Sequence, residues 1–284
     1  MKSRTLFTLI FITALSVNSA CSPERENPLK NVRYTSEDSL KCMEVIEIFK
    51  DYKPLPSAEL ATQIAIHFMG TTYVASTLEI EPEALTISLL KTDCILFVEM
   101  CSCLALTIKS ENPSFEKYCD NIREMRYING VVDGYASRNH YTSGWIIQNE
   151  QRGLMEEITL NVGGKESKQS FSFMSKNADK YDQLKKSPEL IPAIKKVEES
   201  LNEHKYYSLP KNSIDLNKDK IKNGDIVCFV SSLEGIDVSH VGFAYYVGKE
   251  LHFIHASSSQ MEVVIEKKTL QEYTKTGIRV VRLN

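Results

Sequence analysis

The sequence lacks the surplus of positive charge that proteins use to hold nucleic acids. Its 284 residues include 34 lysines and arginines against 37 aspartates and glutamates, which gives a formal net charge of −3. Binding to a nucleic-acid backbone depends mainly on clustered basic side chains, so a nucleic-acid partner is not expected. Internal repeats and low-complexity tracts are also missing. Hydrophobic residues make up 42% of the chain and charged residues 25%, a composition typical of a globular protein.

Regularly spaced cysteines are missing as well. The chain has seven cysteines, but no two of them form a CxxC pair. This spacing argues against a zinc knuckle and against a disulfide framework, so neither a metal nor a cofactor is predicted. The cysteines that follow Cys21 are Cys42, Cys94, Cys101, Cys103, Cys119 and Cys228. Most of them lie in apolar runs, which is typical of small buried side chains.

The N-terminal segment contains no apolar run long enough to span a bilayer. It reads MKSRTLFTLIFITALSVNSAC, with basic residues first, a short apolar stretch over 6–17, and small residues before Cys21. This pattern predicts an export signal peptide over residues 1–20. A cysteine at this point is typical of a bacterial lipoprotein, in which Cys21 carries a diacylglyceryl group and residues 21–36 form a tether. Plain secretion is the alternative.

These features predict where the protein is found. We expect an exported protein, in the periplasm or at the outer membrane of a Gram-negative bacterium. Its contact with the membrane would be the lipid on Cys21. Residues 37–284 are expected to form a single domain of the α+β class, with a helical half over 37–125, an intermediate region over 126–220 and a β half over 221–284.

Four segments have the periodicity of helices. The first is an amphipathic helix over 37–51, whose buried face is expected to hold Leu40, Met43, Ile46 and Phe49. The others are expected over 58–69, 94–108 and 189–204. The segment over 94–108 is apolar nearly all round and follows two good N-cap residues, Thr92 and Asp93, so it is predicted to be a buried central helix.

The C-terminal part has the short runs of branched and aromatic residues that are typical of strands. The predicted strands cover 225–230, 240–247, 251–256, 262–268 and 278–283. The stretch GKE at 248–250 is the tight connection of a hairpin. We therefore expect an antiparallel sheet that packs against the helices.

Cys94 is the first residue of the predicted central helix. The unpaired N–H groups and the dipole at a helix start favour negative charge, which lowers the pKa of a thiol and favours a thiolate nucleophile. Cys101 and Cys103 lie two turns deeper in the same helix and gain nothing from this effect. Considered alone, a cysteine in such a run is more often a buried core residue.

Two histidines lie at one end of the predicted hairpin. His240 opens one strand and His255 closes the next, and Gly242 leaves room behind His240. His252 is three residues from His255, so it faces the other side of the sheet. A thiol, a base and an orienting group that converge in this way are suited to acyl transfer. A zinc site made by Cys94 and the two histidines, and an ordinary packed sheet, are the alternatives.

These stretches resemble the NlpC-type cell-wall peptidases, which are papain-like enzymes. The motifs that carry the resemblance are TDC at 92–94, HVGFAYYVG at 240–248, FIHASS at 253–258 and GYASRxHY at 134–141. The last of them resembles one subfamily, the N-acetylmuramoyl-L-alanine amidase-like proteins. The resemblance extends from about residue 40 to the C-terminus. One departure is Asn139, which stands where an apolar residue is common.

The resemblance implies a papain-like fold, in which the helices pack on a sheet that curves into a half-barrel. It also implies that Cys94 is the nucleophile, His240 the general base and His255 the group that orients the imidazole. The implied reaction is hydrolysis of the amide between the lactyl group of N-acetylmuramic acid and L-alanine. The implied substrates are peptidoglycan fragments, or muropeptides, preferably the 1,6-anhydro forms released during wall turnover. A γ-D-glutamyl-diamino-acid endopeptidase and a non-catalytic peptidoglycan-binding lipoprotein are the alternatives.

Substrate contacts are expected mainly from 126–145, a segment rich in tyrosine that holds the only tryptophan. Sugars stack on aromatic faces, and a guanidinium can hold a carboxylate through two hydrogen bonds. The predicted substrate-binding residues are Tyr127, Tyr135, Ser137, Arg138, His140, Tyr141 and Trp145, together with Glu79, Asp237 and Ser239. Arg138 is the strongest candidate, because an arginine among tyrosines and histidines is seldom there only for packing. Core packing of the aromatic residues is the alternative.

Overall fold

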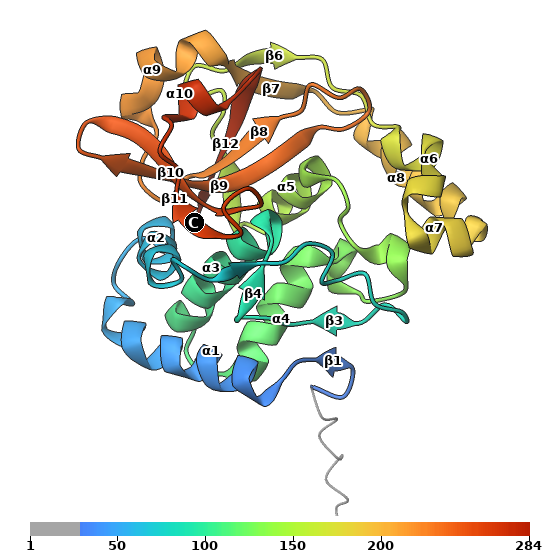
Figure 1. Cartoon of the computed structure of the whole chain (residues 1–284), viewed down its shortest axis with the longest axis horizontal. Helices are drawn as coiled ribbons and strands as arrows, with labels where there is room; N and C mark the ends of the chain where they lie inside the picture. The colour runs from blue at the N-terminus through green and yellow to red at the C-terminus, as the bar shows by residue number, and fades with distance from the viewer. Residues whose placement is uncertain (1–28) are drawn as a thin grey trace, which may run out of the picture.

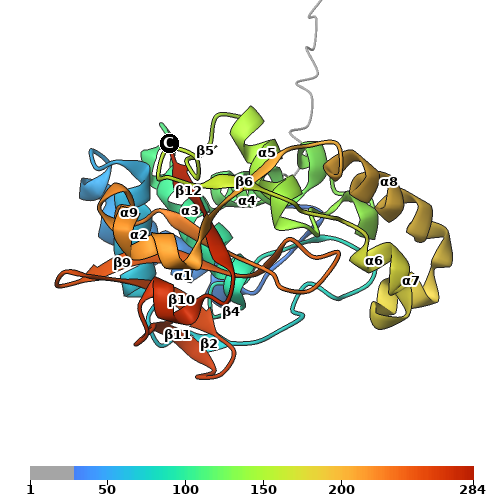
Figure 2. The same cartoon turned by 90° about the horizontal axis from the view of Figure 1, so that it is seen from above.

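The computed structural model describes residues 29–284, so the predicted signal peptide and Cys21 lie outside the described residues. Within the described part, helices pack against a mostly antiparallel sheet, which confirms the α+β class (Figure 1). Helices α1 to α4 form a layer beneath the sheet in Figure 1, and α6 to α8 project at one side, as Figure 2 also shows. No helix of residues 29–284 combines the length and the apolar character needed to cross a bilayer.

The helices occupy both halves of the chain. They are α1 (Ser36–Phe49), α2 (Ser57–His67), α3 (Cys94–Lys109), α4 (Phe115–Arg126), α5 (Thr142–Gln151), α6 (Phe173–Lys176), α7 (Asp182–Lys186), α8 (Ile191–Leu201), α9 (Ile214–Asn217) and α10 (Leu270–Tyr273). The predicted helices over 37–51, 58–69, 94–108 and 189–204 correspond to α1, α2, α3 and α8 and are confirmed.

The strands form one large sheet and one small one. They are β1 (Val32–Arg33), β2 (Thr72–Tyr73), β3 (Leu85–Thr86), β4 (Lys91–Thr92), β5 (Met155–Glu157), β6 (Lys165–Ser167), β7 (Tyr206–Pro210), β8 (Ile226–Val230), β9 (Val238–Val247), β10 (Glu250–Ser257), β11 (Glu262–Ile265) and β12 (Gly277–Leu283). The large sheet has the order β4-β2-β11-β10-β9-β8-β12-β7-β6, and β5 pairs with β12. The five predicted strands correspond to β8 to β12 and are confirmed, although β11 ends three residues earlier than expected.

Helix α3 is the central helix that the sequence predicted. Its N-cap is Asp93, whose side chain accepts a hydrogen bond from the Leu96 N–H at 2.9 Å. The helix is buried along most of its length and packs beneath β9 and β10, where the rings of Phe97 and Phe243 meet edge to face. This packing brings the start of α3, and with it Cys94, under the β9–β10 hairpin.

Helix α1 presents a different face to the core from the predicted one. Leu40 is 69% exposed and Met43 is 43% exposed. The buried residues on its inner face are Cys42, Val45, Ile46 and Phe49. The expectation for Leu40 and Met43 is therefore wrong. A spacing of three falls short of the 3.6-residue helical turn, whereas positions 42, 45, 46 and 49 follow the helical period.

Helix α5 begins inside the segment that was expected to be an irregular substrate loop. Its first turn is capped by a residue far along the chain, because the Ser143 N–H donates to the Asp237 carboxylate at 2.6 Å. Such a contact satisfies one of the free N–H groups of a helix start. Since Asp237 is 94 residues away from Ser143, no local pattern in the sequence could indicate this cap.

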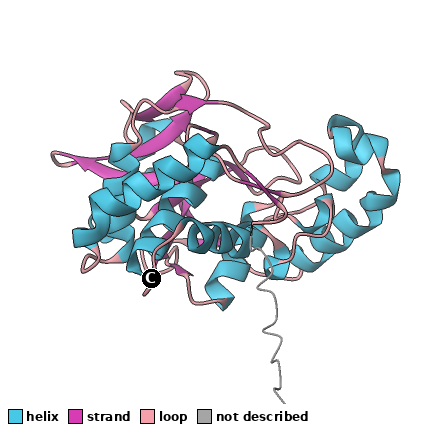
Figure 3. Ribbon diagram, turned by 90° about the horizontal axis from the view of Figure 1, so that it is seen from below, coloured by secondary structure: helices cyan, strands magenta, loops and turns pink. Residues whose placement is uncertain are grey.

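Helices α6 to α8 share an apolar cluster with residues of 135–141, Phe171 and Tyr206 of β7. Its buried members are Tyr135, Tyr141, Phe171, Met174, Leu184, Ile194, Leu201 and Tyr206. Figure 3 shows that this helical group lies apart from most of the strands. The group is joined to the rest of the molecule by hydrogen bonds such as that from the Tyr141 hydroxyl to Glu198, at 2.7 Å.

Candidate active site

The two histidines of the hairpin form a pair. Strands β9 and β10 are antiparallel, with Ile254 opposite Phe243, so His240 and His255 lie at the same end. The distance from His240 Nε2 to His255 Nδ1 is 2.6 Å, and the two rings are nearly perpendicular, at 86°. A side chain at Gly242 would meet the Ile254 carbonyl oxygen at 2.7 Å, so this close approach requires glycine.

Cys94 and His240 line the same cavity, whose volume is about 190 Å³. Its walls come from the start of α3, the segment before and within α5, and the start of β9. The lining residues are Cys94, Ile95, Asn139, His140, Thr142, Trp145, Val238, Ser239, His240 and Val241. The structure therefore brings the three predicted catalytic residues together, Cys94 and His240 at the cavity and His255 behind His240.

The thiol of Cys94 is in a different protonation state from the expected one. Its pKa is raised to about 12, mainly by burial and to a smaller extent by the neighbouring Asp93 carboxylate, against the opposing effect of the backbone N–H groups of Val241, Ile95 and Cys94 itself. The expected thiolate is therefore wrong for the unliganded protein, because desolvation outweighs the effect of the helix start. The resting sulfur carries its proton.

The histidine pair is neutral for the same reason. Burial lowers the pKa of His240 to about 3, with a smaller contribution from His255, and burial also lowers the pKa of His255 to about 4. The hydrogen bond to His255 occupies Nε2 of His240, so Nδ1 is the nitrogen left to exchange a proton with the cavity. The pair and the thiol are thus neutral groups at neutral pH.

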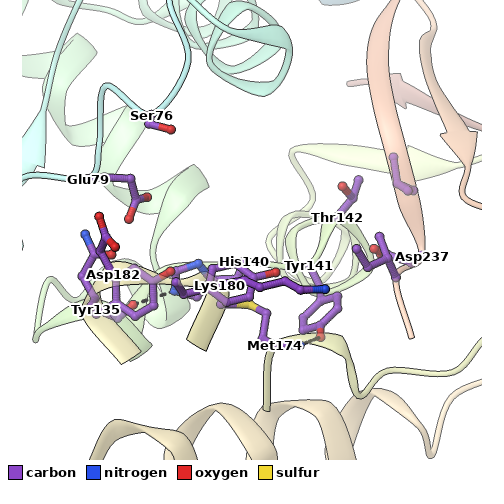
Figure 4. Close-up of a pocket in the computed structure, with 14 residues that line it drawn as sticks. Ser76, Glu79, Tyr135, His140, Tyr141, Thr142, Met174, Lys180, Asp182 and Asp237 are labelled. Atoms are coloured by element: carbon purple, nitrogen blue, oxygen red, sulfur yellow. Dashed lines mark hydrogen bonds between the residues drawn. The ribbon is translucent and has the colours of Figure 1, made fainter. Parts of the chain in front are cut away.

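A second cavity of about 470 Å³ adjoins the first (Figure 4). The two share His140, Thr142 and Val238. Figure 4 shows Glu79 and Asp182 at one end of the second cavity and Thr142 and Asp237 at the other. The remaining lining residues are Ser76, Tyr135, Tyr141, Met174, Lys180, Tyr181, Gln183 and Ile236. The shared residues make one continuous cleft that begins at Cys94.

His140 presents a hydrogen-bond acceptor to this cleft. Its Nε2 lies 2.8 Å from the backbone carbonyl oxygen of Tyr135, which can only accept, so Nε2 carries the proton. The pKa of His140 is lowered to about 3, mainly by burial and to a smaller extent by the Arg138 guanidinium. The imidazole is therefore neutral, and its Nδ1 can accept a donor from a bound molecule.

Arg138, like Tyr127 and Ser137, lines neither cavity. Its side chain is buried, donates to Glu79 at 2.7 Å and to the Leu78 carbonyl at 3.3 Å, and lies 5.1 Å from the centre of the Tyr135 ring. In this structure the guanidinium joins the loop around Glu79 to the wall of the cleft, and its binding to a substrate carboxylate stays a prediction.

Of the other predicted residues, two lie outside both cavities and the rest line one or both of them. Tyr127 is fully buried, with its hydroxyl 2.6 Å from Glu83, and Ser137 hydrogen-bonds within its own turn. Trp145 and Ser239 line the cavity of Cys94, whereas the larger cavity is lined by Glu79, Tyr135, His140, Tyr141 and Asp237. Sequence reasoning did not find the residues of 174–183 that line the cleft, because their short helices have no clear period.

The lowered pKa values of the three histidines predict a loss of stability in acid. The unfolded chain binds protons near the ordinary histidine value of 6.5, whereas folded His140 and His240 bind them only near 3. Stability is therefore present above about pH 6.5 and falls as the pH decreases through the window below it. We expect the unfolding free energy to fall from pH 6.5 to pH 4.5, and the variant His140→Gln to show a shallower fall.

The measurement is urea unfolding followed by circular dichroism at several pH values. The variant His204→Gln is the control, because His204 is exposed and lines neither cavity. Equal slopes for the His140→Gln variant and the unchanged protein would contradict the prediction.

This chain is similar to proteins of one family. The family of N-acetylmuramoyl-L-alanine amidase-like proteins matches residues 63–278. An N-acetylmuramoyl-L-alanine amidase from Bacteroides uniformis is 34% identical, with 80% of this chain and 99% of its own covered and a TM-score of 0.76. A putative xylanase from Bacteroides fragilis is 36% identical, with 78% and 100% covered and a TM-score of 0.74.

A third solved structure shares the fold at lower identity. It is a Legionella pneumophila protein of a family with unknown function, 21% identical, with 86% of this chain and 94% of its own covered and a TM-score of 0.63. None of the curated proteins matches the chain. The fold, the site and these relatives define an amidase, a hydrolase of amide bonds. The chain belongs to the N-acetylmuramoyl-L-alanine amidase-like family, as its motifs predicted.

Proposed function

We propose that this protein is a cysteine-dependent N-acetylmuramoyl-L-alanine amidase with a papain-like catalytic core, the sheet of which is the predicted half-barrel. It would hydrolyse the amide between the muramoyl lactyl group and L-alanine in peptidoglycan fragments. The observation that carries the proposal is that Cys94 and His240 line one cavity while His255 holds the far nitrogen of His240 at 2.6 Å. A nucleophile, a base and an orienting group in this order are the parts that acyl transfer requires.

The first half of the reaction forms a thioester. Nδ1 of His240 takes the proton from the Cys94 thiol as the sulfur attacks the lactyl carbonyl carbon. The carbonyl oxygen becomes an oxyanion, and the backbone N–H of Cys94 at the start of α3 can donate to it. The tetrahedral intermediate then collapses, the C–N bond breaks, and His240 returns the proton to the leaving amine of L-alanine. The muramoyl group remains on the sulfur.

The second half releases the sugar acid. Water gives a proton to His240 and attacks the thioester carbonyl, and the C–S bond breaks. The thiolate that leaves recovers its proton from His240, which restores two neutral groups. Because burial raises the pKa of the Cys94 thiol, a free thiolate is costly here, and this favours a proton transfer coupled to each bond change.

The cleft fits a substrate with a polar extension. The neutral His140, which lines both cavities, offers an acceptor, and the larger cavity adds Lys180 from the segment before α7 and Asp182 from the first turn of α7. A muropeptide carries both amide N–H donors and free carboxylates, which suit these groups. We propose 1,6-anhydro muropeptides from wall turnover as the preferred substrates.

The proposed cellular location follows from the N-terminal sequence. We propose export to the periplasm or the outer membrane, with a lipid on Cys21 as the membrane anchor. Metabolic labelling with a palmitate analogue tests this, because the label should be lost in the variant Cys21→Ala. Labelling that persists in this variant would contradict the anchor.

The activity is tested by digestion of a purified anhydro muropeptide and mass spectrometry of the products. An amidase releases the intact peptide, beginning with L-alanine, and the free anhydro sugar acid. A γ-D-glutamyl endopeptidase would instead remove only the distal residues and leave L-alanine on the sugar. That product, or binding without any cleavage, would overturn the proposal.

A further inference from the structure

A fourth polar group lies behind the histidine pair. Glu266 follows the last residue of β11, and its backbone N–H donates to the Phe253 carbonyl of β10 at 2.9 Å. The Glu266 carboxylate oxygen Oε2 lies 3.4 Å from Nε2 of His255. Both side chains are largely buried, with exposed fractions of 2% for His255 and 13% for Glu266. Neither the sequence motifs nor the proposed mechanism uses this carboxylate.

The nitrogen that faces Glu266 needs a partner. Nε2 of His255 is fully buried and makes no hydrogen bond of normal geometry with any residue of 29–284. A buried polar group without a partner is destabilising, so a nearby carboxylate is a favourable neighbour for it. At 3.4 Å the contact is long for a hydrogen bond, but it is close enough for a strong electrostatic preference in a buried site.

This contact determines which nitrogen of each ring carries a proton. The Nδ1 of His255 and the Nε2 of His240 are 2.6 Å apart, so one of them donates and the other accepts. A carboxylate can only accept, so it favours the form of His255 with its proton on Nε2. Nδ1 of His255 is then the acceptor, and Nε2 of His240 must be the donor.

The result is the form of His240 that the reaction needs. With its proton on Nε2, His240 has a free electron pair on Nδ1, the nitrogen that exchanges protons with the cavity of Cys94. In the opposite arrangement Nδ1 would already carry a proton and could not accept one from the thiol. The wrong tautomer of a catalytic histidine is known to cost several orders of magnitude in rate.

We propose that Glu266 is a positioning residue, which selects the base form of His240 through His255. The same carboxylate faces the positive charge that develops on the pair when His240 takes the proton, and so stabilises it. Glu266 touches neither cavity, and its role is carried by the two rings. The inference rests on the proposed function, because it assigns His240 the role of base for Cys94.

The direct test is the tautomeric state of the two histidines, measured by nitrogen-15 NMR of the full chain at pH 7. We expect a proton on Nε2 of both His240 and His255 in the unchanged protein. In the variants Glu266→Gln and Glu266→Ala we expect a shift of both rings toward the form with the proton on Nδ1. This readout needs no substrate, so it can succeed even where the proposed amidase activity fails.

The second readout is kinetic and uses an anhydro muropeptide. We expect kcat to fall about 10- to 100-fold in Glu266→Ala, as for other outer partners that orient a functional histidine, with KM within about twofold. Glu266→Gln keeps the size of the side chain and an acceptor oxygen but loses the charge. Its kcat should therefore lie between that of the unchanged protein and that of Glu266→Ala. A merely structural role would change the unfolding midpoint and would not produce this order with an unchanged KM.

The matched control is Glu250→Gln. Glu250 lies 3.6 Å from Nε2 of His252 in the same hairpin, and His252 lines neither cavity. This variant should leave kcat and the tautomers of the other two histidines unchanged. A proton on Nδ1 of His255 in the unchanged protein, or unaltered tautomers and kcat in Glu266→Ala, would overturn the inference.

Discussion

The variant Cys94→Ala should lose at least about 10⁴-fold in kcat on an anhydro muropeptide, because it removes the atom that forms the thioester. Binding should be retained, since most of the cleft is made by other residues. The measurement is product release followed by mass spectrometry, with calorimetry for binding of the intact substrate. Full cleavage by this variant would remove Cys94 from the mechanism while leaving the family assignment intact.

The control for this variant is Cys101→Ala. Cys101 lies in the same helix, is fully buried and lines neither cavity. It should keep kcat within a few-fold, although the lost packing lowers the unfolding free energy. If both alanine variants lost activity equally, the loss in Cys94→Ala would reflect damage to α3 and not the missing nucleophile.

The variant Arg126→Met should lower the unfolding free energy by about 3–5 kcal/mol, because it leaves a buried carboxylate without its partner. Arg126 ends α4 and donates to Glu99 of α3 at 2.7 Å and to the Thr86 carbonyl at the same distance. Burial raises the pKa of Glu99, whereas the charge and hydrogen bond of Arg126 act to lower it. Glu99 lies in the helix that begins at Cys94, so the loss should also reach the site.

The matched control is Arg123→Met on the same helix. Arg123 pairs with Asp120 at 2.6 Å, but both side chains are about one-third exposed, and such pairs contribute at most about 1 kcal/mol. Urea unfolding compares the two variants with the double variant Glu99→Leu/Arg126→Met, which should recover part of the loss. Equal destabilisation by the two single variants would show that the buried pair has no special weight.

The sequence could predict the pairing of the two histidines because their geometry is local. The hairpin has a period of two and a tight turn, and these place His240 and His255 at one end without any knowledge of the rest. The N-cap of α3 was equally local, since Asp93 directly precedes Cys94. The α+β order of helices and strands also followed from periodicity alone.

The parts that sequence reasoning missed depend on contacts between distant segments. The cap of α5 by Asp237 is one such contact, and the contribution of 174–183 to the cleft is another. The protonation of Cys94 was missed because the sequence shows only the helix dipole, which lowers the pKa of the thiol. The burial that outweighs the dipole and raises this pKa arises from the fold around the start of α3. For Arg138, its partner Glu79 lies 59 residues earlier, so its ion pair was not visible in the local sequence.

The separate apolar cluster of α6 to α8 has a consequence for how this architecture can diversify. Because this cluster shares no buried residue with the core around α3, substitutions within α6 to α8 should leave the packing of that core unchanged. The segment from α6 to α8 also supplies Lys180 and Asp182 to the lining of the larger cavity. Exchange of α6 to α8 between relatives should therefore change which peptidoglycan fragments are bound. The proposed reaction at the Cys94 sulfur should stay the same.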